Sequence, residues 1–131
     1  MTRVPSEPST TGLRPHVASA LAYLAGPFSG VLVLMAERTN SLVRFHAWQS
    51  IIGLGGLGLF VAVLILSAFA AIVISAALFR ALLYAGWAVW TAWILLWVVC
   101  IVKAYQGQRW KLPLAGDYAE RVSRISSPSS A

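Results

Sequence analysis

The middle of this sequence has almost no charge. Residues 50–102 contain one charged side chain, Arg80, and no Asp, Glu or Lys. A run of this length and polarity is excluded as the core of a small soluble domain. An α-helix rises about 1.5 Å per residue and bilayer hydrocarbon is about 30 Å thick, so about 20 apolar residues cross it. The run is long enough to cross a membrane and return near Arg80, and it predicts an integral membrane protein.

Acidic residues, cysteine and histidine are also scarce. The 131 residues include four Asp and Glu, two histidines and one cysteine. Cys100 has no second cysteine for an intramolecular disulfide, so it says nothing about redox compartment. His16 and His46 fall on opposite sides of the membrane if the first apolar segment spans it, and they then cannot share a metal ion. Because the sequence lacks a Cys/His cluster, a Ser-His-acid set on one face and an intramembrane carboxylate pair, we predict no enzymatic activity, metal or cofactor.

The net charge of +6 comes from ten Lys and Arg against four Asp and Glu. Most of these basic residues flank apolar segments, where such residues set orientation and contact anionic headgroups. The stacking aromatics and basic groove of a nucleic-acid-binding surface are missing. The expected partners are therefore the lipid bilayer, anionic headgroups at the basic face, and a homo-oligomer or larger membrane complex, but no nucleic acid.

Three apolar segments predict an all-α, polytopic membrane helical bundle with short loops and a basic C-terminal tail. Ser41 is the predicted N-cap of the second of these helices. The expected organisation is a flexible tail at 1–13, a membrane helical domain at 14–121 with spans at about 16–36, 42–75 and 81–105, and a disordered tail at 122–131.

The distribution of Lys and Arg predicts the orientation. With three spans, seven of the ten basic residues share a side with the C-terminus, which places the C-terminus in the cytoplasm. In an alternative topology, residues 17–35 enter the membrane and return at Gly26-Pro27, and nine of the ten become cytoplasmic. Such a turn exposes backbone polar groups that protein must shield, and this chain is small. A span kinked at Pro27 is therefore favoured, and the alternative stays open.

Glycines follow the pattern of a helix-packing surface. The spacing of residues 53–58 matches a dinucleotide-binding fingerprint, but the following 20 residues are apolar and hold no acidic residue for a ribose. Small residues at i, i+3 and i+7 of a membrane helix instead let another helix approach closely. The predicted packing residues are Gly26, Gly30, Gly55, Gly58 and Ala62.

Four tryptophans share one side of the third apolar segment. At about 100° per residue, Trp87, Trp90, Trp93 and Trp97 lie within an arc of about 120°. They are interpreted as filling the bundle or facing lipid, because Thr91 is the sole polar residue of the span near them. A site for a lipid, quinone or pigment is the alternative.

Polar residues gather where the apolar segments reach the cytoplasmic side. Arg44, His46 and Gln49 begin the second span, and charged residues at an edge of low dielectric tend to pair, so Arg44 or Arg109 is expected to pair with Asp117 or Glu37. An anchored interface, with Arg side chains reaching the headgroups, is favoured over a ligand site. The predicted cluster consists of Arg44, Phe45, His46, Gln49, Tyr105, Arg109, Trp110 and Asp117.

Two blocks, residues 43–50 (VRFHAWQS) and 103–119 (KAYQGQRWKLPLAGDYA), carry a family resemblance. With the Gly-Pro pair at 26–27, they resemble small bacterial membrane proteins of unknown function. That family is grouped with the chloroplast inner-envelope protein-import component of the Tic translocon and includes magnetosome membrane proteins. The resemblance implies a multi-pass protein of the bacterial inner membrane. It also predicts that the two blocks meet, with Phe45, His46 and Gln49 against Tyr105, Trp110 and Asp117.

The leading functional prediction is a small membrane protein without catalytic activity, which acts as a helix-packing scaffold or as an accessory subunit of a membrane complex. The alternative is an oligomeric conduit or protein-translocation component, by analogy with the Tic import family. A pore needs polar lining residues, and the candidates inside the spans are Ser19, Ser67, Ser75 and Thr91.

Overall fold

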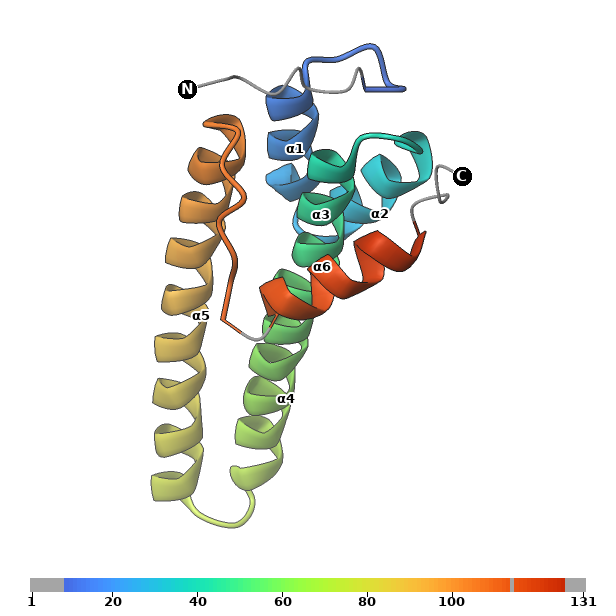
Figure 1. Ribbon diagram of the computed structural model, residues 1–131. Coiled ribbons are helices and arrows are strands. Elements are labelled where there is room, and N and C mark those ends of the chain that lie inside the picture. The colour runs from blue at the N-terminus through green and yellow to red at the C-terminus, as the bar shows by residue number, and fades with distance from the viewer. Residues whose placement is uncertain (1–8, 114, 127–131) are drawn as a thin grey trace.

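The computed structural model describes residues 9–113 and 115–126, and within them every regular element is helical, as expected for an all-α fold (Figure 1). The elements are α1 (Pro15–Leu24), α2 (Pro27–Ala36), α3 (Ser41–Gln49), the π-helical turn η1 (Ser50–Leu54), α4 (Gly55–Ala71), α5 (Ala76–Tyr105) and α6 (Ala115–Ser126).

Two helical segments are long and apolar enough to cross a membrane. The elements α3, η1 and α4 form one run of 31 residues, Ser41–Ala71, and α5 has 30 residues. They pack side by side and antiparallel, joined by a turn at residues 72–75 (Figure 1). The Ser75 side chain caps α5, and Arg80 lies inside the first turns of α5 rather than in the turn itself. The second and third predicted spans therefore correspond to α3–α4 and α5, with the turn shorter than expected.

The first apolar segment does not form a single helix. It consists of two ten-residue helices, α1 and α2, separated at Ala25-Gly26, where Gly26 has φ +61°. After Gly26 the chain reverses, so that α1 and α2 pack on each other and both pack on α3 (Figure 1). The predicted kinked span over residues 16–36 and the total of three spans are therefore not confirmed, and the chain reverses at Gly26-Pro27, as in the alternative topology.

Side-chain donors reinforce the backbone carbonyls at this reversal, where Gly26 N donates to the Tyr23 carbonyl at 2.9 Å and Gly30 N to the Gly26 carbonyl at 3.3 Å. The Ser29 hydroxyl lies 3.1 Å from the carbonyl oxygens of both Ala22 and Gly26 and donates to this pair of acceptors. Ser50 Oγ donates to the Gly26 carbonyl at 2.8 Å, and Trp97 Nε1 donates to the Tyr23 carbonyl at 2.5 Å. An unsatisfied backbone group in an apolar surrounding costs several kcal/mol. These donors come from α2, η1 and α5, and they explain why a small chain tolerates the fold-back.

The four tryptophans on one side of α5 form two pairs with different surroundings. Trp93 Nε1 donates to the carbonyl of Leu54 at 3.0 Å, at the end of the π-helical turn, as Trp97 does at the break after α1. Trp87 and Trp90 instead lie exposed, with their rings in edge-to-face contact at 5.3 Å. Trp93 and Trp97 therefore pack between helices, and Trp87 and Trp90 lie on the outer surface.

Glycines permit close approach at two of the predicted positions, Gly30 and Gly55, whereas a side chain at Gly58 would make an ordinary contact. A Cβ on Gly30 would lie 3.0 Å from the Ala47 carbonyl oxygen, and one on Gly55 would lie 3.3 Å from Pro27. A Cβ on Gly58 would meet Trp93 Nε1 at 3.9 Å. Ala62 is exposed within the chain, so its predicted packing role stays a prediction.

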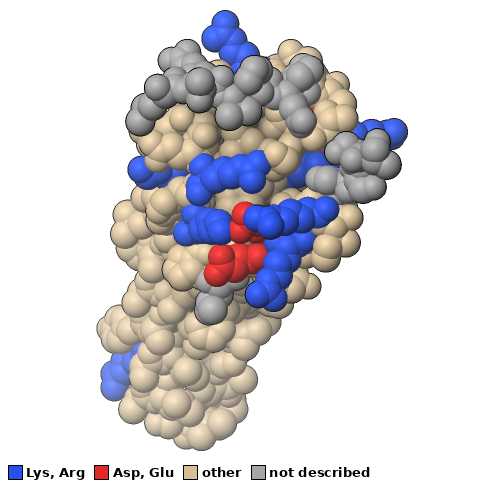
Figure 2. Space-filling view, in the orientation of Figure 1, with Lys and Arg blue, Asp and Glu red and all other residues tan. Residues whose placement is uncertain are grey.

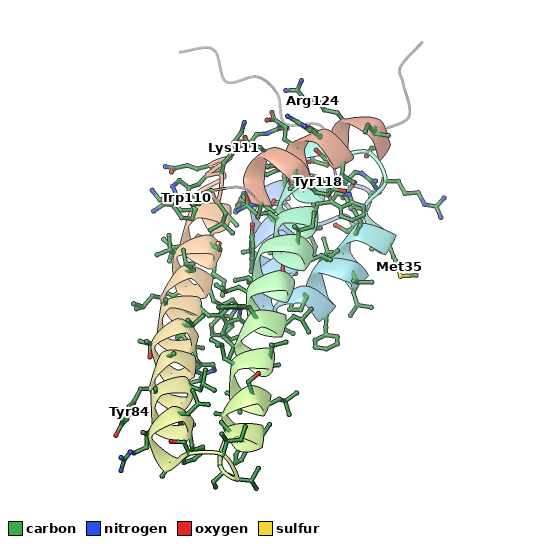
Figure 3. The ribbon with its side chains drawn as sticks, turned by 90° about the horizontal axis from the view of Figure 1, so that it is seen from below. Met35, Tyr84, Trp110, Lys111, Tyr118 and Arg124 are labelled. Atoms are coloured by element: carbon green, nitrogen blue, oxygen red, sulfur yellow. The ribbon has the colours of Figure 1, made fainter. Side chains whose placement is uncertain are left out.

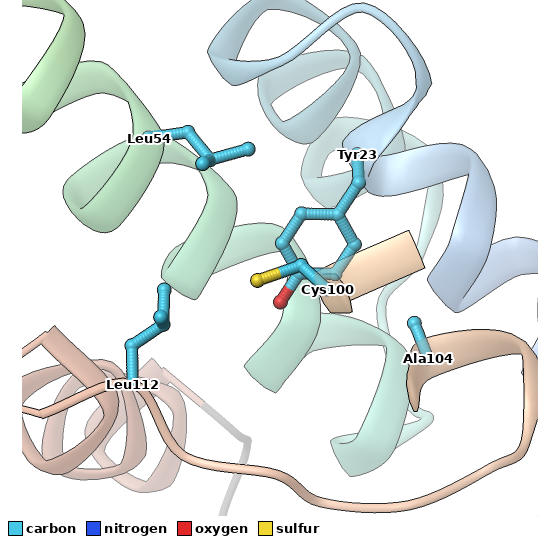
Figure 4. Close-up of a cluster of buried hydrophobic side chains, with 5 residues drawn as sticks. All are labelled: Tyr23, Leu54, Cys100, Ala104 and Leu112. Carbon is cyan, nitrogen blue, oxygen red and sulfur yellow. The ribbon is translucent and has the colours of Figure 1, made fainter. Parts of the chain in front are cut away.

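Four helices gather at one end of the α4–α5 pair, and we call α1, α2, α3, α6 and the C-terminal turns of α5 the helical cap. Its apolar centre is a buried cluster from α1, η1, α5 and the segment before α6, formed by Tyr23, Leu54, Cys100, Ala104 and Leu112 (Figure 4). Lys, Arg, Asp and Glu side chains gather over the cap, whereas the α4–α5 end is almost bare of them (Figure 2). The described chain begins and ends at the cap, at residues 9 and 126 (Figure 1).

The ends of the described chain differ from the expected tails. Residues 122–126 belong to α6, so the helix extends into the segment predicted as disordered. Residues 9–13 form a turn that is hydrogen-bonded to Glu37, so this part of the predicted flexible tail is anchored. The remaining parts of both predicted tails, residues 1–8 and 127–131, lie outside the described residues.

Candidate functional site: the polar centre of the cap

The short helix α3 carries the polar centre of the cap. Asn40, rather than the predicted Ser41, caps it: Asn40 Oδ1 accepts hydrogen bonds from the amides of Leu42 and Val43 at 3.1 and 3.2 Å. Beyond this cap, all residues from 43 to 50 except Trp48 are buried. A helix buried on nearly all sides needs partners for its polar side chains, and α3 finds them on three neighbouring segments.

His46 connects α3 to the folded-back segment. Its Nδ1 lies 3.0 Å from the Tyr23 hydroxyl of α1, and both residues are at most 1% exposed. The His46 ring also makes edge-to-face contacts with the rings of Tyr23 and Phe45, at 5.7 and 5.2 Å between centroids. Tyr23 was not among the predicted site residues, since it lies in the middle of an apolar segment where nothing in the sequence marks it.

Gln49 connects α3 to the chain beyond α5. Its Nε2 donates to the Trp110 carbonyl at 3.1 Å, and its Oε1 accepts from the Leu112 amide at 3.3 Å. The two sequence blocks therefore meet through Gln49. The segment after α5 has no regular backbone hydrogen bonds of its own. The Gln49 side-chain amide therefore provides partners for one backbone carbonyl and one backbone amide of this segment.

Other members of the predicted cluster lie apart from this centre. Tyr105 is 62% exposed and its ring contacts His16 at 5.6 Å, while Arg109 Nη2 donates to Ser41 Oγ at 2.6 Å. Asp117 lies on α6, 3.6 Å from Lys111 Nζ. Arg44 donates from Nη1 to the backbone carbonyl of Glu37 at 2.8 Å. The expected pairing of Arg44 or Arg109 with a carboxylate of Asp117 or Glu37 is not among the ion pairs of the described residues.

Glu37 holds the N-terminal turn against the loop between α2 and α3. The residue is fully buried, and its carboxylate accepts hydrogen bonds from Thr10 N, Thr10 Oγ1 and Asn40 N at 2.8–3.2 Å, and also from Ser9 Oγ. Burial raises the pKa of Glu37, but hydrogen bonds outweigh it and lower the pKa to about 2; the donors are Asn40, Ser9, Thr10 and Thr39. Sequence reasoning considered Glu37 only as an ion-pair partner and missed this role.

Replacing Glu37 by Gln should destabilise the protein at neutral pH and reduce its sensitivity to acid. Because the pKa falls from 4.5 to about 2 on folding, the ionised carboxylate contributes about 3 kcal/mol above pH 4.5. That contribution is lost as the pH falls from about 4.5 to about 2. Thermal unfolding in detergent, followed across this pH range, should show a steep loss for the natural protein and a shallow one for Glu37→Gln. Equal slopes would contradict the role given to Glu37.

An ion-pair network lies outside the apolar helices, on α6. Glu120 contacts Lys111 Nζ at 2.5 Å and Arg124 Nη2 at 2.8 Å. Hydrogen bonds from Lys111 and Arg124 lower the pKa of Glu120, and the Glu120 carboxylate raises the pKa of Lys111. The partners Lys111, Asp117 and Arg124 are solvent-exposed, so the pairs orient α6 rather than adding much stability.

The buried centre is built to hold segments together. Tyr23, His46 and Gln49 each bridge two elements, and within the described residues no three His, Cys, Asp or Glu side chains gather at metal-binding distance. Fold and site together describe a small, all-helical membrane protein whose α3 anchors a folded-back N-terminal hairpin and the segment after α5.

The chain belongs to the magnetosome magnetite crystal formation protein family, MamF_MmsF, whose sequence profile matches residues 9–119. It is similar to a UPF0132 membrane protein of Methanocaldococcus jannaschii, with 36% identity over 120 residues, 88% of this chain and 94% of the relative. A second M. jannaschii relative is 38% identical over 86% of this chain and 73% of its own length. A third relative, from Archaeoglobus fulgidus, is 33% identical over 83% of this chain and 95% of its own length. No solved structure matches the chain.

These comparisons confirm the predicted membership of a small membrane-protein family of unknown function. The relatives are named membrane proteins and the chain has two apolar helices of sufficient length, so the chain is a membrane protein. These relatives are archaeal. The link to the Tic import component and the location in a bacterial inner membrane stay predictions.

Proposed function

We propose that this protein is a non-catalytic membrane component that packs an apolar helix of a neighbouring membrane protein against its α4–α5 pair. The observation that carries the proposal is an apolar groove of about 650 Å³ between α2, α4 and α5. Its lining includes three of the predicted packing glycines, Gly26, Gly55 and Gly58.

The chemistry of the groove fits a helix without polar side chains. Pro27, Phe28 and Leu59 form its edges, and the Trp93 and Trp97 indoles form a wall. Both indole N–H groups already donate to backbone carbonyls, so the wall leaves no polar group for a ligand to satisfy. In lipid, helices associate through close packing at small residues, and glycines let two backbones approach.

The proposed topology places α4 and α5 across the membrane and the helical cap, with both chain ends, on the cytoplasmic side. Among the described residues, Arg80, in the first turns of α5, is the one basic residue at the end of the α4–α5 pair away from the cap, and the other Lys and Arg belong to the cap or its connecting segments. An excess of Lys and Arg marks the cytoplasmic side of membrane proteins. The charge distribution in Figure 2 follows this division.

The conduit alternative has less support. Ser67 and Thr91, which a pore would need for its lining, are exposed on α4 and α5, and Thr91 Oγ1 donates to the carbonyl of Trp87 at 2.9 Å in its own helix. Ser19 is buried in the cap, and Ser75 caps α5. These hydroxyls do not share one surface of the α4–α5 pair, so we do not propose translocation.

A side chain that fills the groove should strongly reduce association with the neighbouring helix. A photo-crosslinking amino acid at position 59, which is 68% exposed and lines the groove, should give a discrete protein adduct in intact membranes. The variant Gly58→Leu should reduce this adduct at least several-fold, since the new side chain occupies the groove. The adduct mass distinguishes a second copy of this chain from another protein, and either result supports the proposal.

The matched control is Gly56→Leu, two residues away, because Gly56 is exposed and a Cβ there meets no atom within 4 Å. This variant should keep the adduct. Crosslinking at position 59 to lipid alone, or an adduct unchanged by Gly58→Leu, would contradict helix packing in the groove.

A further inference from the structure

The helix α6 has two different exposed sides. Its packed side, with Gly116, Ala119 and Ser123, is buried against the cap, where α6 contacts α3 and η1. One exposed side repeats at i, i+3 and i+7 with Asp117, Glu120 and Arg124. The other repeats at the same spacing with Tyr118, Arg121 and Ile125. Arg124 and Tyr118 lie on different sides of α6 in Figure 3.

The charged groups on the side with Asp117, Glu120 and Arg124 form ion pairs within the protein. Lys111 pairs with both Asp117 and Glu120, and Arg124 pairs with Glu120, so its two carboxylates are neutralised by two neighbouring cations. This side needs no further partner and is suited to water.

The second side combines exposed apolar groups with an available charge. Tyr118 is 59% exposed and Ile125 is 84% exposed. Arg121 lies between them along the helix, at the border with the first side, where it shares a small hollow with Asp117, Glu120 and Arg124. It is exposed and has no ion pair or hydrogen bond within the described part of the chain. An exposed isoleucine beside an unpaired arginine is typical of a helix that lies in the plane of a membrane surface, with its apolar groups in the acyl boundary and its cation at phosphate level.

The position of α6 relative to the apolar helices agrees with this assignment. It packs on η1, which directly precedes the 17 residues of α4. At about 1.5 Å per residue, α4 is about 25 Å long, close to the hydrocarbon thickness of about 30 Å. The helix α6 runs across the α3–α4 direction at that level (Figure 1). It is therefore located where α4 would leave the hydrocarbon.

We propose that α6 is an in-plane membrane anchor that binds the phosphate of anionic phospholipids through Arg121 and inserts Tyr118 and Ile125 between the lipids. The partner is the bilayer leaflet at the cap, and the anchor fixes the depth of the cap. This inference uses the proposed topology to place the leaflet, and it is independent of helix packing in the groove.

The test uses the full-length protein with Cys100 replaced by Ala and a spin label at Ile125→Cys or, as the water-side control, Asp117→Cys. Nanodiscs are made of phosphatidylcholine alone or with phosphatidylglycerol. The ratio of oxygen to nickel-chelate accessibility should be several-fold higher at 125 than at 117, and phosphatidylglycerol should raise it at 125. The variant Arg121→Gln should remove the response to phosphatidylglycerol, whereas Arg38→Gln, elsewhere on the cap, should keep it.

Equal accessibility at positions 117 and 125 would overturn the anchor. Lipid burial at 125 without a response to phosphatidylglycerol, or with a response that Arg121→Gln leaves intact, would overturn the role of Arg121. Inorganic phosphate in excess should not reproduce the effect in phosphatidylcholine discs; if it does, the site binds free phosphate and the lipid assignment is wrong. Loss of crosslinking in the groove would leave these results unchanged, so the two proposals fail separately.

Discussion

Replacing Trp97 by Phe should lower the unfolding temperature by about 2–6 °C, although an aromatic ring is kept at this position. The change removes the indole N–H that donates to the Tyr23 carbonyl, at the break between α1 and α2. The Tyr23 carbonyl still accepts from the Gly26 amide at 2.9 Å, so the change removes one of its two hydrogen bonds, which costs about 0.5–1.5 kcal/mol, and each kcal/mol shifts the midpoint of a domain of this size by several degrees. Thermal unfolding in detergent measures the shift.

The chain contains matched controls for this substitution on the same helix. Trp87→Phe and Trp90→Phe remove the same N–H from exposed indoles that make no hydrogen bond within the described residues, and each should change stability by less than about 0.5 kcal/mol. Trp93→Phe should resemble Trp97→Phe, since Trp93 donates to the Leu54 carbonyl. Equal effects at all four positions would show that ring packing, rather than the carbonyl acceptors, accounts for the stability.

Replacing Gln49 by Leu should destabilise the protein by about 2–5 kcal/mol and release the segment between α5 and α6. Leucine has a similar volume, but it leaves the Trp110 carbonyl and the Leu112 amide without partners in a buried setting. Because this segment connects α5 to α6, hydrogen exchange at residues 108–112 should accelerate more than exchange in α4.

The control for Gln49 is Gln106→Leu, because Gln106 is exposed at the end of α5. This variant should stay within about 0.5 kcal/mol of the natural protein. If Gln49→Leu has as small an effect, Gln49 does not hold the two sequence blocks together.

The sequence predicted the parts of the fold that depend on hydrophobic length. Two long apolar segments and a turn near Arg80 follow from the absence of charge, and the structure has α3–α4 and α5 there. The reversal at Gly26 was considered and disfavoured, because the sequence does not show which side chains reach its carbonyls. Those donors, Ser50 and Trp97, lie 24 and 74 residues along the chain from their acceptors.

The site was predicted unevenly for a similar reason. His46 and Gln49 stand out as polar residues at the start of an apolar helix, and both are central in the structure. Tyr105 and Asp117 belong to the same block as Trp110 but lie apart from the buried centre. After α5 the chain turns at Gly107, with φ +70°, and only part of the following segment contacts α3. Tyr23 and the hydrogen bonds of Glu37 depend on tertiary contacts that local sequence does not encode.

The central claim is that the N-terminal hairpin turns back at Gly26, so that it does not cross the membrane. Single cysteines at positions 13, 77 and 108, in a Cys100→Ala background, can be labelled in sealed native vesicles with a membrane-impermeant maleimide. We predict that positions 13 and 108 are labelled from one side and position 77 from the other. Labelling of 13 together with 77, and of 108 from the opposite side, would show three crossings and contradict the account.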